Sequence, residues 1–145
     1  MARRLEVLRG MLKGEVPLPP IARLVGFTLV SVEAGEVVIE FEANERHANL
    51  VGTLHGGALC VIADAAMSMA YGSTLEEGQT YATLELKINY LKPVWKGRLR
   101  AVGRVVKGGQ TVGLVECDVT DAEQHLVARA MGTCMTLRGD QAQGR

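Results

Sequence analysis

The sequence has few cysteines and few histidines, and neither residue type is spaced as a disulfide framework or a metal site. The 3 cysteines, Cys60, Cys117 and Cys134, lie far apart and form no CxxC pair. They are typical of small buried side chains in a protein of a reducing compartment. The 3 histidines show no HExxH or other close ligand spacing. The sequence therefore predicts no metal and no cofactor.

An excess of charge and a long hydrophobic run are also missing. The 16 Lys and Arg residues balance the 16 Asp and Glu residues and are scattered along the chain. This pattern favours neither nucleic acid nor an anionic membrane as a partner. The beginning of the chain lacks the apolar core of a signal peptide, and no segment is typical of a membrane span. We therefore expect a cytoplasmic protein whose partners are a small molecule or further copies of the chain.

The length of 145 residues, of which 48% are hydrophobic, predicts one globular domain over residues 1–145. Leu5, Leu8 and Leu12 recur at helical spacing, which predicts a short amphipathic helix that ends before Pro17. Residues 1–20 then form this helix and a proline-rich lead-in. At the other end, the polar residues 138–145 are expected to form a loose tail.

Alternating hydrophobic residues predict the strands. A hairpin is expected from the strands 27–32 and 37–41, and a polar loop then leads to residue 53. Beyond it, period-two alternation predicts four strands in antiparallel succession, over residues 82–90, 99–105, 111–119 and 125–137. In the first of these strands, Thr83 falls on the face opposite to Leu84, Leu86 and Tyr90. Gly108 and Gly109 are typical of a tight hairpin turn.

Between the polar loop and the long strand lies the segment HGGALCVIADAAMSMA, residues 55–70. It predicts a helix that is apolar on nearly all sides, as expected for a helix buried inside a protein. The resulting class is α+β, with one central helix covered by an antiparallel sheet. A helix of this kind keeps an apolar face after one sheet has wrapped it, which suggests contact with another subunit.

Asp64 is the one carboxylate of this helix. Helical geometry places it on a stripe with Gly57, Cys60, Met67 and Ser68, among others. It could be a structural group that is hydrogen-bonded to Ser68 or to a strand. An aspartate in apolar surroundings is, however, a poor choice for filling a core and is suited to act as a base or nucleophile. We favour the second interpretation.

Gly56 and Gly57 mark the start of the helix, where backbone N–H groups lack internal partners and the helix dipole is positive. They could hold an oxyanion, or they could merely allow close packing, and both interpretations stay open. Gly56 and Asp64 are eight residues apart, about 12 Å along a helix, whereas two groups acting on one carbonyl should each approach it to roughly 3 Å. We therefore predict two antiparallel helices, with Gly56 of one subunit facing Asp64 of the partner subunit.

The segment NLVGTLHGG, from Asn49 to Gly57, is followed by Asp64 in the apolar helix and by Thr83 at the start of the long strand. This pattern resembles the hotdog-fold acyl-CoA thioesterases of the phenylacetic acid degradation (PaaI-like) type. The likeness extends from the Asn49 loop to Leu137. It implies a long helix wrapped by an antiparallel sheet, edge-to-edge dimers, and a homotetramer built as a dimer of dimers.

The resemblance also implies roles for the residues. The Gly56 N–H polarises the thioester carbonyl of an acyl-CoA, and Asp64 of the partner subunit acts as general base or nucleophile. Asn49 and His55 help to position the thioester or the helix end, and Thr83 helps to hold the attacking water. Each residue has a structural alternative, because Asn49 could only stabilise its loop, His55 could only cap the helix, and Thr83 is common in strands.

Two other functions compete with hydrolysis. One is a sensor of the same fold that binds acyl-CoA without cleaving it, although binding alone requires no aspartate in the helix. The other is a hydratase, whose acidic and histidine residues are arranged differently. The acyl-chain specificity, the choice between nucleophile and general base, and the residues that contact the phosphates of coenzyme A are not determined by the sequence.

Overall fold

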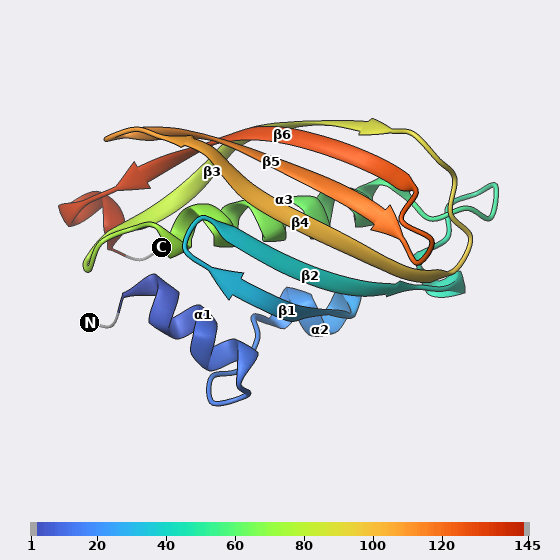
Figure 1. Ribbon diagram of the computed structural model, residues 1–145, viewed down its shortest axis with the longest axis horizontal. Coiled ribbons are helices and arrows are strands. Elements are labelled where there is room, and N and C mark those ends of the chain that lie inside the picture. Colours follow the sequence, from blue (N-terminus) through green and yellow to red (C-terminus); the bar gives the residue numbers. More distant parts are fainter. Residues whose placement is uncertain (1–2, 144–145) are drawn as a thin grey trace.

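The computed structural model describes residues 3–143, and in these residues a six-stranded antiparallel sheet curves around one long helix (Figure 1). The helices are α1 (Arg4–Leu12), α2 (Pro20–Val25) and α3 (Gly56–Ser73). The strands are β1 (Phe27–Glu33), β2 (Glu36–Ala43), β3 (Thr80–Tyr90), β4 (Gly97–Gly108), β5 (Val112–Asp121) and β6 (Leu126–Leu137). This is the α+β architecture of a hotdog fold. The central helix and the short N-terminal helix α1 are both confirmed.

The strand order in the sheet is β1-β2-β4-β5-β6-β3, and all neighbouring strands are antiparallel. The predicted succession after the helix is therefore wrong at one point, because β3 pairs with β6 and not with β4. The reason is the connection over residues 91–96, which crosses the end of the sheet instead of turning back tightly. Hydrogen bonds hold it there, from Leu91 N to Val127 O (2.8 Å) and from Leu54 N to Val94 O (2.7 Å).

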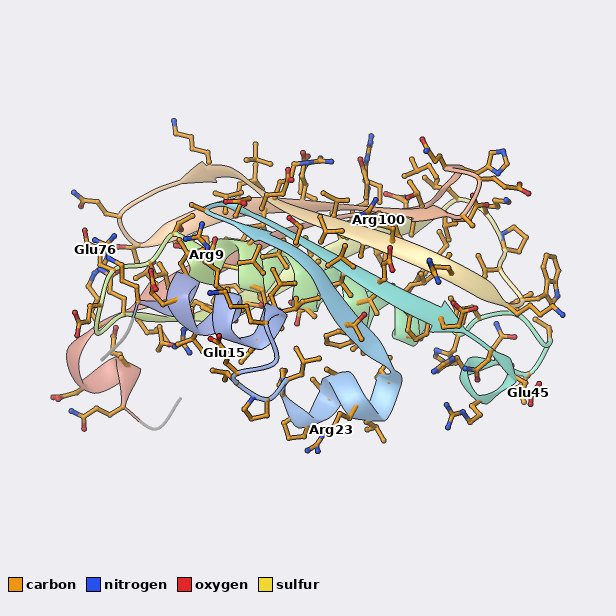
Figure 2. The ribbon with its side chains drawn as sticks, turned by 60° about the horizontal axis from the view of Figure 1, so that its bottom comes forward. Arg9, Glu15, Arg23, Glu45, Glu76 and Arg100 are labelled. Atoms are coloured by element: carbon orange, nitrogen blue, oxygen red, sulfur yellow. The ribbon has the colours of Figure 1, made fainter. Side chains whose placement is uncertain are left out.

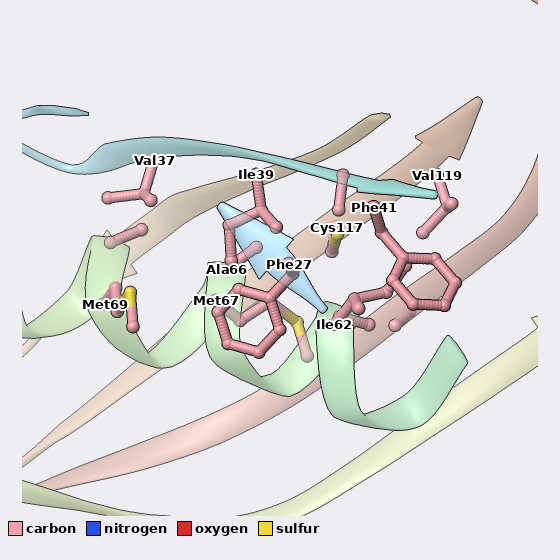
Figure 3. Close-up of a cluster of buried hydrophobic side chains, with 14 of the residues drawn as sticks. Phe27, Val37, Ile39, Phe41, Ile62, Ala66, Met67, Met69, Cys117 and Val119 are labelled. Carbon is pink, nitrogen blue, oxygen red and sulfur yellow. The ribbon is translucent and has the colours of Figure 1, made fainter. Parts of the chain in front are cut away.

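The core lies between the concave face of the sheet and α3 (Figure 3). From β2, Val37, Ile39 and Phe41 are at most 1% exposed, and Ile62 and Met67 of α3 meet them with at most 1% exposure. Fully burying each large apolar side chain contributes about 1.5–3 kcal/mol. The hydrophobic face of β2 thus fixes α3 in the sheet, and with it both predicted halves of the site.

Two short helical segments, before β1 and after β6, were not predicted from the alternating pattern. A second short helix, α2, begins with Pro20 and ends at Gly26, whose φ of 96° is a left-handed conformation. Proline at the first helical position and glycine just past the end are the usual signals of such a helix. In the segment that was expected to be a loose tail, Gly139–Ala142 form a 3-10 helix, and residues 144 and 145 lie outside the described residues.

Figure 2 shows the side chains, and charged residues that it labels, among them Arg9 on α1, Arg23 on α2 and Arg100 on β4, are exposed. Within residues 3–143, no helix combines the length and the apolar character that crossing a membrane requires.

Candidate active site

The first turn of α3 presents one backbone donor that no protein group uses. His55 is the N-cap, and its Nδ1 accepts a hydrogen bond from the N–H of Gly57 at 2.8 Å. This confirms the capping alternative for His55. The N–H of Gly56 has no intramolecular acceptor among residues 3–143. Gly56 thus combines a free donor with the positive end of the helix dipole.

Asn49 builds the loop that precedes the helix. Its Oδ1 accepts hydrogen bonds from the backbone N–H groups of Val51 (3.0 Å) and Thr53 (3.2 Å), and its Nδ2 donates to the Thr53 hydroxyl oxygen at 2.9 Å. The loop-stabilising role of Asn49 is therefore present. Asn49 and Gly56 also line one cavity of about 410 Å³. The other lining residues are Thr53, Leu54, Leu59, Tyr90, Leu91, Lys92, Pro93 and Val94.

Asp64 lies further along α3 and is partly exposed. Its Oδ1 accepts a hydrogen bond from the hydroxyl of Thr83 at 2.9 Å, so β3 holds this carboxylate. Ser68, the alternative partner expected from the sequence, instead donates to the backbone oxygen of Ala65 at 3.4 Å. The structure therefore brings Asp64 and Thr83 together.

The face predicted for Thr83 is wrong, and a β-bulge is the reason. The pairing of β3 with β6 shifts between Thr83 and Glu85, which leaves Leu84 as the extra residue. A bulge inverts the alternation of side chains on its two sides. Thr83 consequently faces α3, as Leu86 does beyond the bulge, whereas Leu84 is 53% exposed.

Tyr90, at the end of β3, is a site residue that the sequence analysis missed. Its hydroxyl donates to the backbone oxygen of Gly56 at 3.0 Å and lies 3.2 Å from Sγ of Cys60. The Cys60 hydrogen bond, together with partial burial, raises the pKa of Tyr90 to about 12. A Cβ atom on Gly56 would lie only 2.7 Å from the ring and hydroxyl of Tyr90, so a glycine is needed for this contact. The position of Tyr90 on the predicted hydrophobic face of β3 was the sequence signal that could have identified this residue.

Gly56 and Asp64, the two predicted halves, remain apart within one chain, because a separation of eight residues corresponds to about 12 Å of helix. The side of α3 that carries both residues faces the edge strand β3, whose Tyr90 and Thr83 contact Gly56 and Asp64, and it is only partly covered. Gly57 is exposed, and Cys60 and Asp64 are partly exposed. Met67 was expected on the same stripe, but it is 1% exposed and belongs to the core.

Among the described residues, one cluster could offer three metal-ligand atoms, namely Asp121, Glu123 and His125. The ammonium group of Lys92 already pairs with Asp121 there. The hydrogen bond from Lys92 also keeps the pKa of Asp121 well below its ordinary value. None of the five predicted site residues belongs to this cluster.

Comparisons with known proteins identify the family. Residues 51–128 match the family model described as thioesterase superfamily. Acyl-coenzyme A thioesterase 13 of Homo sapiens is 31% identical over 136 residues, which are 92% of this chain and 96% of that protein. The 1,4-dihydroxy-2-naphthoyl-CoA hydrolase of Listeria monocytogenes is 29% identical over 103 residues, or 71% of this chain and 84% of that protein.

Among solved structures, a phenylacetic acid degradation-related protein from Ralstonia eutropha JMP134 superimposes with a TM-score of 0.81 at 33% sequence identity. The match covers 89% of this chain and 98% of that chain.

Proposed function

This chain belongs to the thioesterase superfamily, and from that premise we propose that it hydrolyses the thioester bond of acyl-coenzyme A. One observation carries the proposal. Helix α3 begins with the free N–H of Gly56, and the same helix carries Asp64, a partly exposed carboxylate that accepts a hydrogen bond from Thr83. The names of the relatives support the substrate class, since one is an acyl-coenzyme A thioesterase and another hydrolyses a naphthoyl-CoA.

Gly56 stabilises the negative charge that develops on the thioester oxygen. The donor is a backbone N–H at a helix N-terminus, so it needs no proton transfer and no reorganisation when the charge develops. Removing one donor of this kind typically lowers kcat by about 10²–10³-fold. The cavity that Gly56 lines gives the thioester room to reach it.

Two side chains hold this donor in place. His55 Nδ1 binds the N–H of the Gly56–Gly57 peptide, and the Tyr90 hydroxyl binds its carbonyl oxygen. Because both polar atoms of that peptide are occupied, its plane is fixed, and so is the direction of the neighbouring Gly56 N–H. Tyr90 and His55 are therefore positioning residues.

Asp64 activates the attacking group. As a general base, its carboxylate takes a proton from water while the water oxygen attacks the carbonyl carbon. The tetrahedral intermediate then collapses, the C–S bond breaks, and the coenzyme A thiolate leaves and is protonated. As a nucleophile, the carboxylate itself displaces the thiolate, and water cleaves the resulting anhydride. In both routes the Thr83 hydroxyl orients the carboxylate.

The complete site requires two subunits. A thioester bound at Gly56 is about 12 Å from Asp64 of the same chain, which is too far for a reaction on one carbonyl. A two-fold axis between antiparallel α3 helices brings Gly56 of one protomer to Asp64 of its partner and creates two identical sites. Strand β3 lies at an edge of the sheet and offers the surface for a continuous sheet across the dimer. Two such dimers would form the tetramer.

The test is the release of free thiol from a panel of aryl-CoA and straight-chain acyl-CoA thioesters. We expect the wild type to cleave part of the panel and Asp64→Asn to be at least about 10²-fold slower, because the base or nucleophile is lost. Glu76→Gln removes an exposed carboxylate beyond the end of α3 and should leave the rate unchanged.

Thr83 provides a matched pair for the same assay. Thr83→Ala removes the hydroxyl that holds Asp64, so kcat should fall about tenfold, whereas Thr83→Ser keeps the hydroxyl and most of the rate. If wild-type protein binds the thioesters but releases no thiol from any of them, hydrolysis is wrong and the protein is an acyl-CoA-binding sensor.

A further inference from the structure

A second cavity adjoins the one at Gly56. It has a volume of about 380 Å³ and is formed mainly by residues 92–99 and residues 121–123. Lys92, Pro93 and Val94 line both cavities, so the two adjoin at these residues, and we refer to both cavities together as the groove. The groove runs from the helix start over the connection between β3 and β4. The catalytic proposal uses only its first half.

The second half contains an exposed aromatic side chain. Trp95 is the only tryptophan of the chain, and 60% of its surface is exposed. It therefore contributes little to the core. An exposed indole beside a cavity is a suitable surface for stacking a heteroaromatic ring, an interaction worth about 1–3 kcal/mol for a nucleobase.

Two cations beside Trp95 lack a close carboxylate. Lys96 forms no ion pair with any described residue, and the guanidinium of Arg98 comes no nearer than 4.0 Å to Glu40 and Glu42. Lys92 differs, because Asp121 already binds its ammonium group. Phosphate groups are the ligands that free lysine and arginine side chains favour.

The two acidic residues of this cavity do not cancel that preference. Asp121 is engaged by Lys92 and His125. The carboxylate of Glu123 lies 3.4 Å from Nδ1 of His125 and is 78% exposed. Lys96 therefore remains an unpaired charge of the groove, and Arg98 has only two long ion pairs, of 4.0 Å each, with Glu40 and Glu42.

Gly56 and Trp95 are close enough for one molecule to reach both. Leu54 N donates to Val94 O at 2.7 Å, and Leu54 is two residues from Gly56 while Val94 directly precedes Trp95. With Cα steps of about 3.8 Å, Gly56 and Trp95 are at most roughly 18 Å apart. The arm between the sulfur and the first phosphorus of coenzyme A has about 13 bonds, which span roughly 16 Å when extended.

We propose that Trp95, Lys96 and Arg98 bind the phosphorylated adenosine diphosphate end of coenzyme A while the thioester lies at Gly56. Trp95 stacks on the adenine, and Lys96 and Arg98 bind the phosphates. This inference deepens the proposed function and rests on it for the position of the thioester. According to this inference, residues in and just after the connection between β3 and β4 determine the affinity for the substrate, whereas Gly56 and Asp64 carry out the reaction.

The first test is independent of catalysis, because the single tryptophan reports on its own surroundings. Titration of the full chain with coenzyme A, with adenosine 3′,5′-bisphosphate and with pantetheine should change the Trp95 fluorescence for the first two ligands only. The Kd for coenzyme A should rise about tenfold in Lys96→Ala and in Arg98→Ala. Lys107→Ala, an exposed lysine at the far end of β4, is the matched control and should bind as wild type. No response to coenzyme A, or an equal response to pantetheine, overturns the proposal.

The second test separates the nucleotide site from the chemistry. For an acyl-CoA, KM should rise about tenfold in Trp95→Ala and much less in Trp95→Phe, with kcat nearly unchanged. For the same acyl group on N-acetylcysteamine, which has no nucleotide, all variants should match the wild type. Equal effects on both substrates overturn the nucleotide site while leaving hydrolysis intact. If no thioester is hydrolysed at all, the proposed function fails, and the fluorescence titration still decides the nucleotide site.

Discussion

The three thiols of this chain lie in different surroundings, and two of them tie stability to pH. Cys117 is 0% exposed, and burial, followed by the nearby Asp118 charge, raises its pKa from 9.0 to about 12. Burial likewise raises the pKa of Cys134 to about 11. Cys60 is partly exposed beside Tyr90. The protonated form of both buried thiols is therefore the form that the folded state favours.

The first prediction concerns alkaline conditions. A thiol whose pKa is higher in the folded state stabilises the protein fully below its unfolded pKa of 9.0, and this contribution is lost as the pH rises toward 12. The free energy of unfolding should therefore fall above pH 9. In Cys117→Ala this fall should be shallower, although the cavity lowers stability at every pH. Urea unfolding between pH 8 and pH 11 measures the slope, with Val119→Ala, a buried apolar residue of the same strand, as control. Equal slopes for wild type and Cys117→Ala would refute the argument.

Individual site residues differed in how far the sequence could reveal them. Asp64 and Gly56 were predicted because a carboxylate in an apolar helix and glycine at a helix start are local signals. Thr83 was named through family resemblance, but its orientation was wrong because a bulge depends on pairing with β6. Tyr90 contacts Gly56 across 34 residues of sequence, and no periodicity encodes such a contact.

Helix α3 and strand β4 are in close contact at Gly103. A Cβ atom there would lie 2.3 Å from the backbone carbon and oxygen of Ala66 and 2.6 Å from the nitrogen of Met67. A backbone cannot rotate away as a side chain can, so the sheet and the helix would have to separate. This glycine sets the distance between the two layers of the core.

Gly103→Ala should therefore lower the free energy of unfolding by about 3 kcal/mol, the upper part of the range for overpacked cores. Gly108, on the same strand, has no atom within 4 Å of its ideal Cβ position and is the matched control. Gly108→Ala should change stability by less than about 0.5 kcal/mol. Thermal and urea unfolding of both variants provide the measurement. A Gly103→Ala protein as stable as its control would show that the layers are not in contact here.

At the scale of elements, local patterns predicted most of the helices and strands, because periodicity depends on neighbouring residues only. Which strands pair is a property of the whole chain. In the sequence, β4 and β5 lie between β3 and β6. The pairing of β3 with β6 therefore could not be derived from hairpin signals, which join consecutive strands. The helix α2 was missed although Pro20 and Gly26 mark its ends, because the proline-rich segment was interpreted only as a break.

The molecule as a whole carries two incomplete halves of one proposed site on a single helix. Gly56 begins α3 beside a cavity, and Asp64 lies about two turns further along and is partly exposed. Strand β3, which holds Asp64 through Thr83, also forms an edge of the sheet. The central claim is therefore that catalysis needs one half from each of two subunits.

Two variants remove one half each. Gly56→Pro deletes the N–H in question and also brings a Cβ atom against Tyr90. Proline is favoured at the first helical position, and His55, with φ −62° and ψ 132°, tolerates a following proline. Gly56→Ala adds the same Cβ contact with Tyr90 but keeps the N–H, so it controls for crowding. Asp64→Asn removes the carboxylate.

The most direct measurement is thiol release by an equimolar mixture of inactive Gly56→Pro and Asp64→Asn subunits after subunit exchange, with mixed dimers verified by mass spectrometry. With shared sites, half of the dimers are mixed and each has one intact site, so about one quarter of wild-type activity should return. If mixed dimers form and the activity does not return, each site lies within one chain and the account is wrong.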